Sequence, residues 1–196
     1  EISLLHEFLD YTGYVHRFLK TSEKFHFYEG LAIAGRYPIV SNEVKQYVLP
    51  HDSKKRPRRM LLAPFRIAGE TIYVFNLHLS PFPKNIHLRE DQLKYVVSII
   101  VPYLQAHKPV VVMGDFNQDY HSDFFAPLFD LKMKMSLSPN QCTFCRANKY
   151  SIVPNNWKFD YIFYSSDQLE IIKSHLINVE NPISDHYGIK AEFRLK

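Results

Sequence analysis

The segment from residue 110 to 113 constrains the fold most strongly, because all four of its side chains, Val-Val-Val-Met, are apolar. Lys108 and Pro109 stand before this segment, and Gly114 and Asp115 follow it. A short apolar run between polar and turn-forming residues is typical of a strand buried within a sheet. We therefore expect a buried strand here, followed by a loop that carries a carboxylate.

Strand-like and helical segments alternate along the rest of the chain. Apolar patterns predict further strands over residues 2–5, 30–34, 43–49, 60–67, 71–79, 159–164, 171–179 and 187–195. Helical spacing predicts helices over 8–20, 87–107 and 122–129, the second ended early or kinked by Pro102 and the third capped by Ser122. Residues 68–70 indicate a hairpin turn and residues 136–157 a long irregular loop. The pattern predicts a single α/β domain over residues 1–196.

Composition excludes several classes of protein. Hydrophobic residues make up 46% and charged residues 22% of the 196 residues, unlike the composition of disordered or collagen-like chains. A chain of this length fits one domain and needs no metal or disulfide staple in order to fold. No apolar run approaches the roughly 18 residues of a membrane-spanning helix, so we expect no transmembrane segment.

The net charge is +4, and much of the excess lies in one basic run. Its members are Lys54, Lys55, Arg56, Arg58 and Arg59. Such a run is most often a solvated loop, but it also suits contact with the phosphates of a nucleic acid or with an anionic membrane surface. Both interpretations stay open at this stage.

The chain has two cysteines, Cys142 and Cys145. Their spacing matches half of a structural zinc site, but no second pair of Cys or His ligands accompanies it. We therefore expect two ordinary thiols.

Carboxylates, amides and imidazoles occur at or near the ends of several predicted strands. These residues are Glu7, His78, Asp115, Asn117, Asp160, Asp185 and His186. Polar side chains at strand ends can converge on one rim of a sheet. Carboxylate oxygens suit Mg²⁺, and a histidine held by a carboxylate suits general-base catalysis. Taken singly, each residue has an ordinary alternative, such as turn formation by Asp115 and Asn117, helix capping by Glu7, or a buried hydrogen bond by His78.

Six short motifs, in a fixed order, make this pattern specific. They are Leu4-Leu5-His6-Glu7, Gly30-Leu31-Ala32-Ile33 with Arg36-Tyr37-Pro38-Ile39, Asn76-Leu77-His78-Leu79, Gly114-Asp115-Phe116-Asn117, Phe159-Asp160-Tyr161-Ile162-Phe163 and Ser184-Asp185-His186-Tyr187. With them the chain resembles the endonuclease/exonuclease/phosphatase superfamily, a group of deoxyribonuclease-like and sphingomyelinase-like metal-dependent phosphoesterases. The resemblance covers essentially the whole chain and implies a four-layer α/β/β/α sandwich of two mostly antiparallel sheets flanked by helices.

The resemblance also implies a reaction and a role for each catalytic residue. The reaction is magnesium-dependent hydrolysis of a phosphoester by direct attack of water. His186 is the implied general base, and Asp160 orients it. Asp115 and Asn117 position water and phosphate, and His78 supports the leaving group. The implied substrate is a nucleic acid or a phospholipid such as sphingomyelin.

The metal site and the start of the chain are interpreted from the same resemblance. Glu7 and Asp185 match metal-binding positions, for Mg²⁺ or alternatively Mn²⁺, although His6 stands where the family usually has Gln. The family begins with an additional strand that carries an Asn, and no such strand precedes Glu1. We expect that this strand was trimmed away. The alternative is a catalytically impaired binding module with the same fold.

Overall fold

The computed structural model describes residues 15–24, 27–51, 57–81 and 83–196. Its largest sheet has six strands in the order β3-β4-β5-β6-β8-β7. The β5–β6 pair is parallel, and the other neighbours in this sheet are antiparallel. The strands span Lys45–Val48 (β3), Arg59–Ile67 (β4), Glu70–His78 (β5), Val110–Asp115 (β6), Asp160–Ser165 (β8) and Met133–Met135 (β7).

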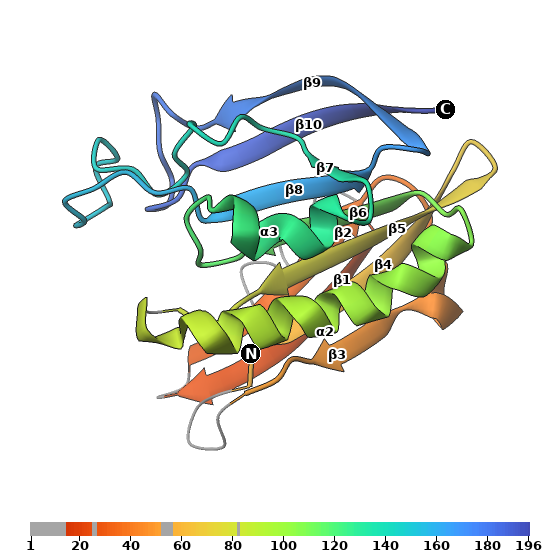
Figure 1. Cartoon of the computed structure of the whole chain (residues 1–196), viewed down its shortest axis with the longest axis horizontal. Coiled ribbons are helices and arrows are strands. Elements are labelled where there is room, and N and C mark those ends of the chain that lie inside the picture. The colour runs from red at the N-terminus through yellow and green to blue at the C-terminus, as the bar shows by residue number, and fades with distance from the viewer. Residues whose placement is uncertain (1–14, 25–26, 52–56, 82) are drawn as a thin grey trace.

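Two helices cover one face of this sheet (Figure 1). α2 (Ile86–Gln105) connects the parallel strands β5 and β6, and α3 (Ser122–Phe129) follows β6 in the chain. Short 3-10 turns precede β3 and α2, at Ser41–Glu43 (η1) and Pro83–Asn85 (η2). The apolar side of α2 shares one buried core with alternate residues of the sheet, among them Leu93, Val96 and Ile100 of the helix and Leu62, Phe75 and Val112 of the strands.

Two hairpin sheets pack on the opposite face. One consists of β1 (Val15–Lys24) and β2 (Phe27–Gly35), and the other of β9 (Leu169–Ile177) and β10 (Gly188–Leu195). Because side chains alternate between the faces of a strand, Leu61 of β4 packs on β2, and Val111 of β6 packs on β9. The expected α/β sandwich is therefore confirmed, and the helices in the described ranges lie on one side of it.

Most expected elements are confirmed, with ends that agree within three residues. The helix expected over residues 8–20 is wrong for residues 15–20, which belong to β1. The apolar residues with helical spacing in this segment are aromatic or β-branched in several places, so they also suit a strand. The antiparallel ladder with β2 then supplies the backbone hydrogen bonds. The rest of that helix and the strand expected over 2–5 lie outside the described residues.

The two helices differ in how their expected ends compare with the structure. α2 continues past Pro102 but ends at Gln105, two residues before the end of the expected range, and the Ala106 N–H donates to the Pro102 carbonyl. The cap expected for α3 is wrong. α3 begins at Ser122, but His121 occupies the N-cap position and no side-chain hydrogen bond caps the helix. The helix is instead held by its buried aromatic side chains in the main core.

Candidate active site

Three of the expected site residues lie side by side because of the strand register. His78 is the last residue of β5, Asp115 is the last of β6, and Asp160 is the first of β8. In the ladders, His78 pairs with Asp115, and Asp115 pairs with Asp160. The parallel β5–β6 pair and the antiparallel β6–β8 pair therefore bring these side chains to one edge of the sheet.

The backbone around the end of β6 is shaped to present Asp115. Gly114 has a φ of 134°, and a Cβ at this position would lie 2.0 Å from the carbonyl oxygen of Leu77. Asn117 has a φ of 50°, in the left-handed region that Asn adopts more readily than most residues. Its backbone N–H donates to Asp115 Oδ1 at 2.7 Å, and its side-chain amide donates to the Leu79 carbonyl at 3.0 Å. The turn after β6 is thus hydrogen-bonded both to the Asp115 carboxylate and to the backbone of Leu79, which follows β5.

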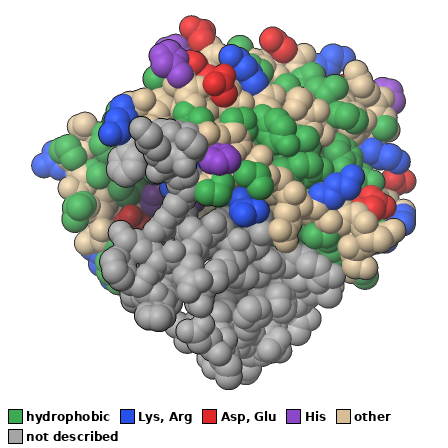
Figure 2. Space-filling view, turned by 90° about the horizontal axis from the view of Figure 1, so that it is seen from below, with side chains coloured by type: hydrophobic (Ala, Val, Ile, Leu, Met, Phe, Trp, Pro, Cys, Tyr) green, Lys and Arg blue, Asp and Glu red, His purple; other side chains and the backbone are tan. Residues whose placement is uncertain are grey.

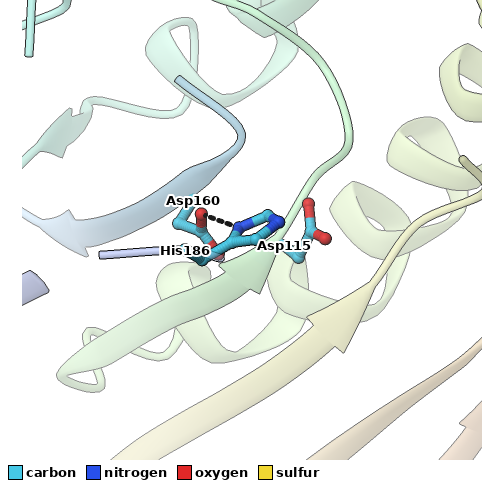
Figure 3. Close-up of side chains that lie close together, drawn as sticks. All are labelled: Asp115, Asp160 and His186. Atoms are coloured by element: carbon cyan, nitrogen blue, oxygen red, sulfur yellow. Dashed lines mark hydrogen bonds and ion pairs between the residues drawn. The ribbon is translucent and has the colours of Figure 1, made fainter. Parts of the chain in front are cut away.

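Asp160 and His186 form a hydrogen-bonded pair (Figure 3). The Nδ1–H of the imidazole donates to Asp160 Oδ2 over 2.7 Å. With its Nδ1 proton held there, the ring accepts a further proton at Nε2, the nitrogen that points toward Asp115 in Figure 3. A carboxylate on one ring nitrogen and an open position at the other is the arrangement that a general base requires.

Burial and neighbouring charges shift the pKa values of this cluster. The pKa of Asp115 is raised to about 7, chiefly by burial and then by the negative charge of Asp160. Burial lowers the pKa of His186, but the hydrogen bond to Asp160 and the negative charges of Asp160, Asp115 and Asp185 outweigh it, so this pKa is raised. These carboxylates therefore create a negative region that favours a protonated imidazole or a bound cation.

His78 and Arg58 lie on the other side of Asp115. His78 Nε2 is 3.6 Å from Asp115 Oδ2, and Arg58 Nη1 is 3.2 Å from His78 Nδ1. Arg58 directly precedes β4, and the antiparallel pairing of β4 with β5 brings it to His78. Its charge also lowers the pKa of Asp115, against the larger effect of burial. Arg58 belongs to the basic run for which the sequence leaves open a solvated loop or a phosphate or membrane contact, and in the structure it lies beside His78.

The remaining predicted site residues are not brought into this cluster. Asp185 is exposed, and its carboxylate accepts a hydrogen bond from the Ser184 hydroxyl at 3.1 Å. Arg59, the last residue of the basic run, begins β4. Glu7 lies outside the described residues, as do Lys54, Lys55 and Arg56. The metal-binding roles of Glu7 and Asp185 therefore stay predictions.

One group of side chains within the described ranges is suited to hold a metal ion: Asp115, Asp160 and His186. One ligand atom from each lies within 4.8 Å of the other two. Carboxylate oxygens fit a hard divalent cation, and the raised pKa of Asp115 means that a positive partner would favour its ionised form. The donor set therefore fits such a cation, although it differs from the predicted pair of ligands.

Cys142 and Cys145 form a disulfide, so the expectation of two ordinary thiols is wrong. Their Cα atoms are 5.6 Å apart, within the usual range for a disulfide. The turn between them forms because the N–H groups of Thr143 and Phe144 both donate to the Trp157 carbonyl. A spacing of two residues between cysteines is compatible with free thiols as well as with a disulfide. Here the turn of the backbone brings the two cysteines close enough to form the disulfide.

Sequence analysis did not assign Thr143, Phe144 or Arg58 to the catalytic cluster. Thr143 Oγ1 accepts a hydrogen bond from the Asp160 N–H at 3.0 Å, and the Phe144 ring lies 4.6 Å from the His186 ring, centroid to centroid. The run of basic residues was the signal for Arg58. Thr143 and Phe144 resemble a Thr-Phe element of the family, but that likeness does not give their contacts, because both contacts join segments far apart in the chain.

Positive charge on the surface is dispersed in the view of Figure 2. Lys and Arg side chains are scattered over the described part of this face, which also carries apolar side chains. None of the helices in the part of the chain that the structure describes is long and apolar enough to cross a membrane. At the rim, Arg58 brings a positive charge next to His78.

Comparisons with known proteins agree with the fold. The model of the Endonuclease/Exonuclease/phosphatase family matches residues 3–186. No curated protein sequence matches the chain. Similar solved structures include the human Nocturnin catalytic domain with bound sulfate anion, with a TM-score of 0.80 and 17% identity over 100% of this chain and 77% of that one. D. rerio TDP2 complexed with single strand DNA product has a TM-score of 0.72 and 17% identity, over 99% of this chain and 83% of that one.

A bacterial protein of the same family, from Beutenbergia cavernae DSM 12333, has a TM-score of 0.78 and 20% identity, over 97% of this chain and 56% of that one. These likenesses concern the fold, and the family match concerns the sequence over most of its length. Both point to the same group of proteins. The chain therefore belongs to the endonuclease/exonuclease/phosphatase family, whose members are hydrolases that act on phosphoester bonds.

Proposed function

We propose that this protein hydrolyses phosphodiesters by direct attack of water, with His186 as the general base. The observation that carries the proposal is the 2.7 Å hydrogen bond between His186 Nδ1 and Asp160. It fixes the ring so that Nε2 points toward Asp115 at the sheet edge (Figure 3). Because the negative charges of the neighbouring aspartates stabilise the imidazolium, the ring can take a proton from the attacking water.

The strand order supports placing the attacking water and the leaving group at opposite sides of Asp115. Asp115 on β6 lies between Asp160 on β8 and His78 on β5. Neighbouring strands are about 5 Å apart, so roughly 10 Å separate the backbones of the outer two. In an in-line displacement the water and the leaving group lie on opposite sides of the phosphorus. We assign His186 to the attacking side and His78 to the leaving side.

Arg58 and Asn117 complete the proposed phosphate site. The Arg58 guanidinium is held beside His78, and its fork of N–H donors matches the oxygens of a phosphate. Asn117 keeps its predicted role with Asp115 in positioning water and phosphate, because the turn that holds it is tied to that carboxylate. Substrate binding and base catalysis thus come from opposite ends of the same row of strands.

A divalent cation is part of the proposal, with Mg²⁺ expected and Mn²⁺ as the alternative. Asp115 would hold it together with the predicted ligands Glu7 and Asp185. When bound, the cation would supply positive charge that stabilises the phosphate oxygens. Asp160 is left to orient His186, which is the use that its short hydrogen bond favours.

The proposed substrate is a nucleic acid or a phospholipid headgroup. The TDP2 structure, which has a similar fold, is a complex with a single strand DNA product, and this supports the nucleic-acid class. The lipid class rests on the Pro-Phe-Pro segment over residues 81–83, which follows His78 closely in the chain. A single activity assay with both classes of substrate tests these two alternatives.

The experiment is a parallel assay of DNA, RNA, sphingomyelin and inositol phosphates with Mg²⁺, on the full-length protein. His186→Ala should lower turnover of the substrate that is cleaved by at least about 100-fold. His87→Ala is the matched control, because His87 is an exposed histidine on α2, and it should leave turnover unchanged. Near-normal turnover in His186→Ala would refute the base assignment. No turnover of any substrate would favour the impaired binding module.

A further inference from the structure

We propose that the Cys142–Cys145 disulfide is a positioning element for the His186–Asp160 pair, and that its reduction lowers kcat with little change in KM. The activity readout rests on the proposed function, whereas a second readout, described below, does not. The proposal starts from the two residues that the disulfide encloses, Thr143 and Phe144. Each of them contacts a member of the pair or its neighbour in the chain.

Thr143 connects the backbone on both sides of the pair. Its Oγ1 accepts hydrogen bonds from the N–H groups of Phe159 and Asp160, both at 3.0 Å. Its carbonyl accepts a hydrogen bond from the N–H of Tyr187, the residue after His186, at 2.7 Å. Thr143 is fully buried, so water does not replace these partners. One residue therefore sets how the start of β8 lies relative to the loop that carries His186.

Phe144 supports the imidazole ring directly. Its ring lies 4.6 Å from the His186 ring and 5.6 Å from the Phe159 ring, measured between centroids. It also stacks on Trp157 at 6.1 Å, and Trp157 N–H donates to the Phe144 carbonyl at 3.0 Å. Phe144 thus packs against the imidazole, and Trp157 and Phe159 pack against Phe144.

The disulfide adds a covalent restraint to the hydrogen bonds that hold this turn within its loop. Residues 136–157 contain no helix and no strand of a sheet, and an isolated bridge pairs Phe144 with Trp157. Closing the turn covalently limits the positions that Thr143 and Phe144 can take. A displacement of about 1 Å at a catalytic group is enough to lower a rate by about 100-fold. Loosening of the turn therefore acts on the step that the pair performs, more than on substrate binding at Arg58.

The chemistry is thiol–disulfide exchange with a dithiol reductant. A thiolate of the reductant attacks the sulfur of Cys142, which is half-buried, and expels the thiolate of Cys145, which is buried. The second thiol of the reductant then displaces Cys142 and closes its own disulfide. The protein gains two electrons and two protons, and the dithiol is oxidised to a disulfide.

The test compares the oxidised protein with the protein reduced by dithiothreitol under native conditions. Trp157 is the single tryptophan of the chain, so its fluorescence reports this turn without any substrate. We expect reduction to change the Trp157 emission, to lower kcat by at least about 10-fold and to leave KM within about two-fold. Reoxidation should restore both signals. The double variant Cys142→Ser/Cys145→Ser should match the reduced protein and should not respond to dithiothreitol, which controls for chelation of the metal.

Two variants of Thr143 separate positioning from folding. Thr143→Ser keeps the hydroxyl acceptor and should retain kcat, whereas Thr143→Val keeps the shape but loses the acceptor and should lower kcat with KM unchanged. Unchanged Trp157 emission and unchanged kcat after complete reduction, confirmed by alkylation and mass measurement, would overturn the proposal. If no substrate is turned over, the proposed function fails, but a reversible change in Trp157 emission still tests the coupling of the disulfide to the turn.

Discussion

Replacement of Asp160 by Asn tests the proposed base most directly, because it removes a charge and keeps the shape of the side chain. The Asn carbonyl can still accept from His186 Nδ1, so the hydrogen bond stays and its ionic part is lost. A hydrogen bond to a charged group contributes about 1.5–3 kcal/mol and a neutral one about 0.5–1.5 kcal/mol, so the ionic part contributes about 1–1.5 kcal/mol. If this difference is expressed in the transition state, where the imidazole carries the proton, kcat should fall by roughly 5- to 13-fold.

The same variant predicts a shift in the pH profile. Asp160 raises the pKa of His186 through its hydrogen bond and its charge, while burial lowers it. Without the carboxylate, burial has the larger share and the pKa falls. Because the base works when unprotonated, the wild-type activity falls as pH drops through the pKa of His186. The acid limb of Asp160→Asn should therefore move to lower pH while its plateau is lower.

The assay is kcat against pH at saturating Mg²⁺ for the wild type, Asp160→Asn and a control, Asp167→Asn. Asp167 is an exposed carboxylate that pairs with Lys132, so its removal should change neither limb nor plateau. A half-saturating Mg²⁺ concentration that rises in Asp160→Asn, with the acid limb unmoved, would refute the reasoning. In that case Asp160 is a metal ligand rather than the residue that orients His186.

Three further predictions follow from the same edge of the sheet. The pKa of Asp115 is raised from 3.8 to about 7, so in metal-free protein its ionisation destabilises the fold as pH rises across that interval. Asp115→Asn should therefore be more stable than the wild type at pH 8 without metal, by on the order of 1 kcal/mol or more in chemical denaturation, and should be inactive. Arg58→Gln should raise KM for a phosphodiester by at least about 10-fold, measured at constant salt, because a charge-assisted contact is lost. Gly114→Ala should lower the free energy of unfolding by at least about 3 kcal/mol, since its Cβ would lie 2.0 Å from a backbone oxygen, whereas Gly69→Ala, with open space at a φ of 86°, should cost only about 1 kcal/mol.

The sequence predicts which residues form the site better than it predicts how those residues are arranged. Asp115, Asp160 and His186 each follow or precede an apolar run, and the order of motifs identifies the family, so their convergence was expected. Their alignment in one row depends on the order β5-β6-β8, which results from contacts between segments far apart in the chain. Local patterns carry no information on strand order.

Arg58 and the cysteine pair are two further cases in which local sequence does not determine the contacts of a residue. A cluster of basic residues is compatible with a solvated loop, and Arg58 reaches the site because β4 pairs with β5 in one particular register. For Cys142 and Cys145, the sequence spacing does not fix the distance between Cα atoms. That distance depends on hydrogen bonds to Trp157, which lies beyond the turn in the chain. In both cases the outcome depends on tertiary pairing, which the local sequence does not determine.

The cluster of Asp115, Asp160 and His186 has two chemical uses that compete for the same atoms. If all three side chains bound one cation, His186 would need an unprotonated nitrogen directed at the metal, and Asp160 would share its oxygens between the metal and the ring. The 2.7 Å hydrogen bond instead commits Nδ1 to Asp160. The Asn117 N–H and the charges of His186 and Arg58 offset the burial of Asp115 only in part, since its pKa is still raised. Incomplete compensation of a buried carboxylate is unfavourable, so Asp115 would gain from a bound cation. A cation held by Asp115 and by ligands other than the pair therefore satisfies both observations, and it keeps the base and the metal as separate parts of the site.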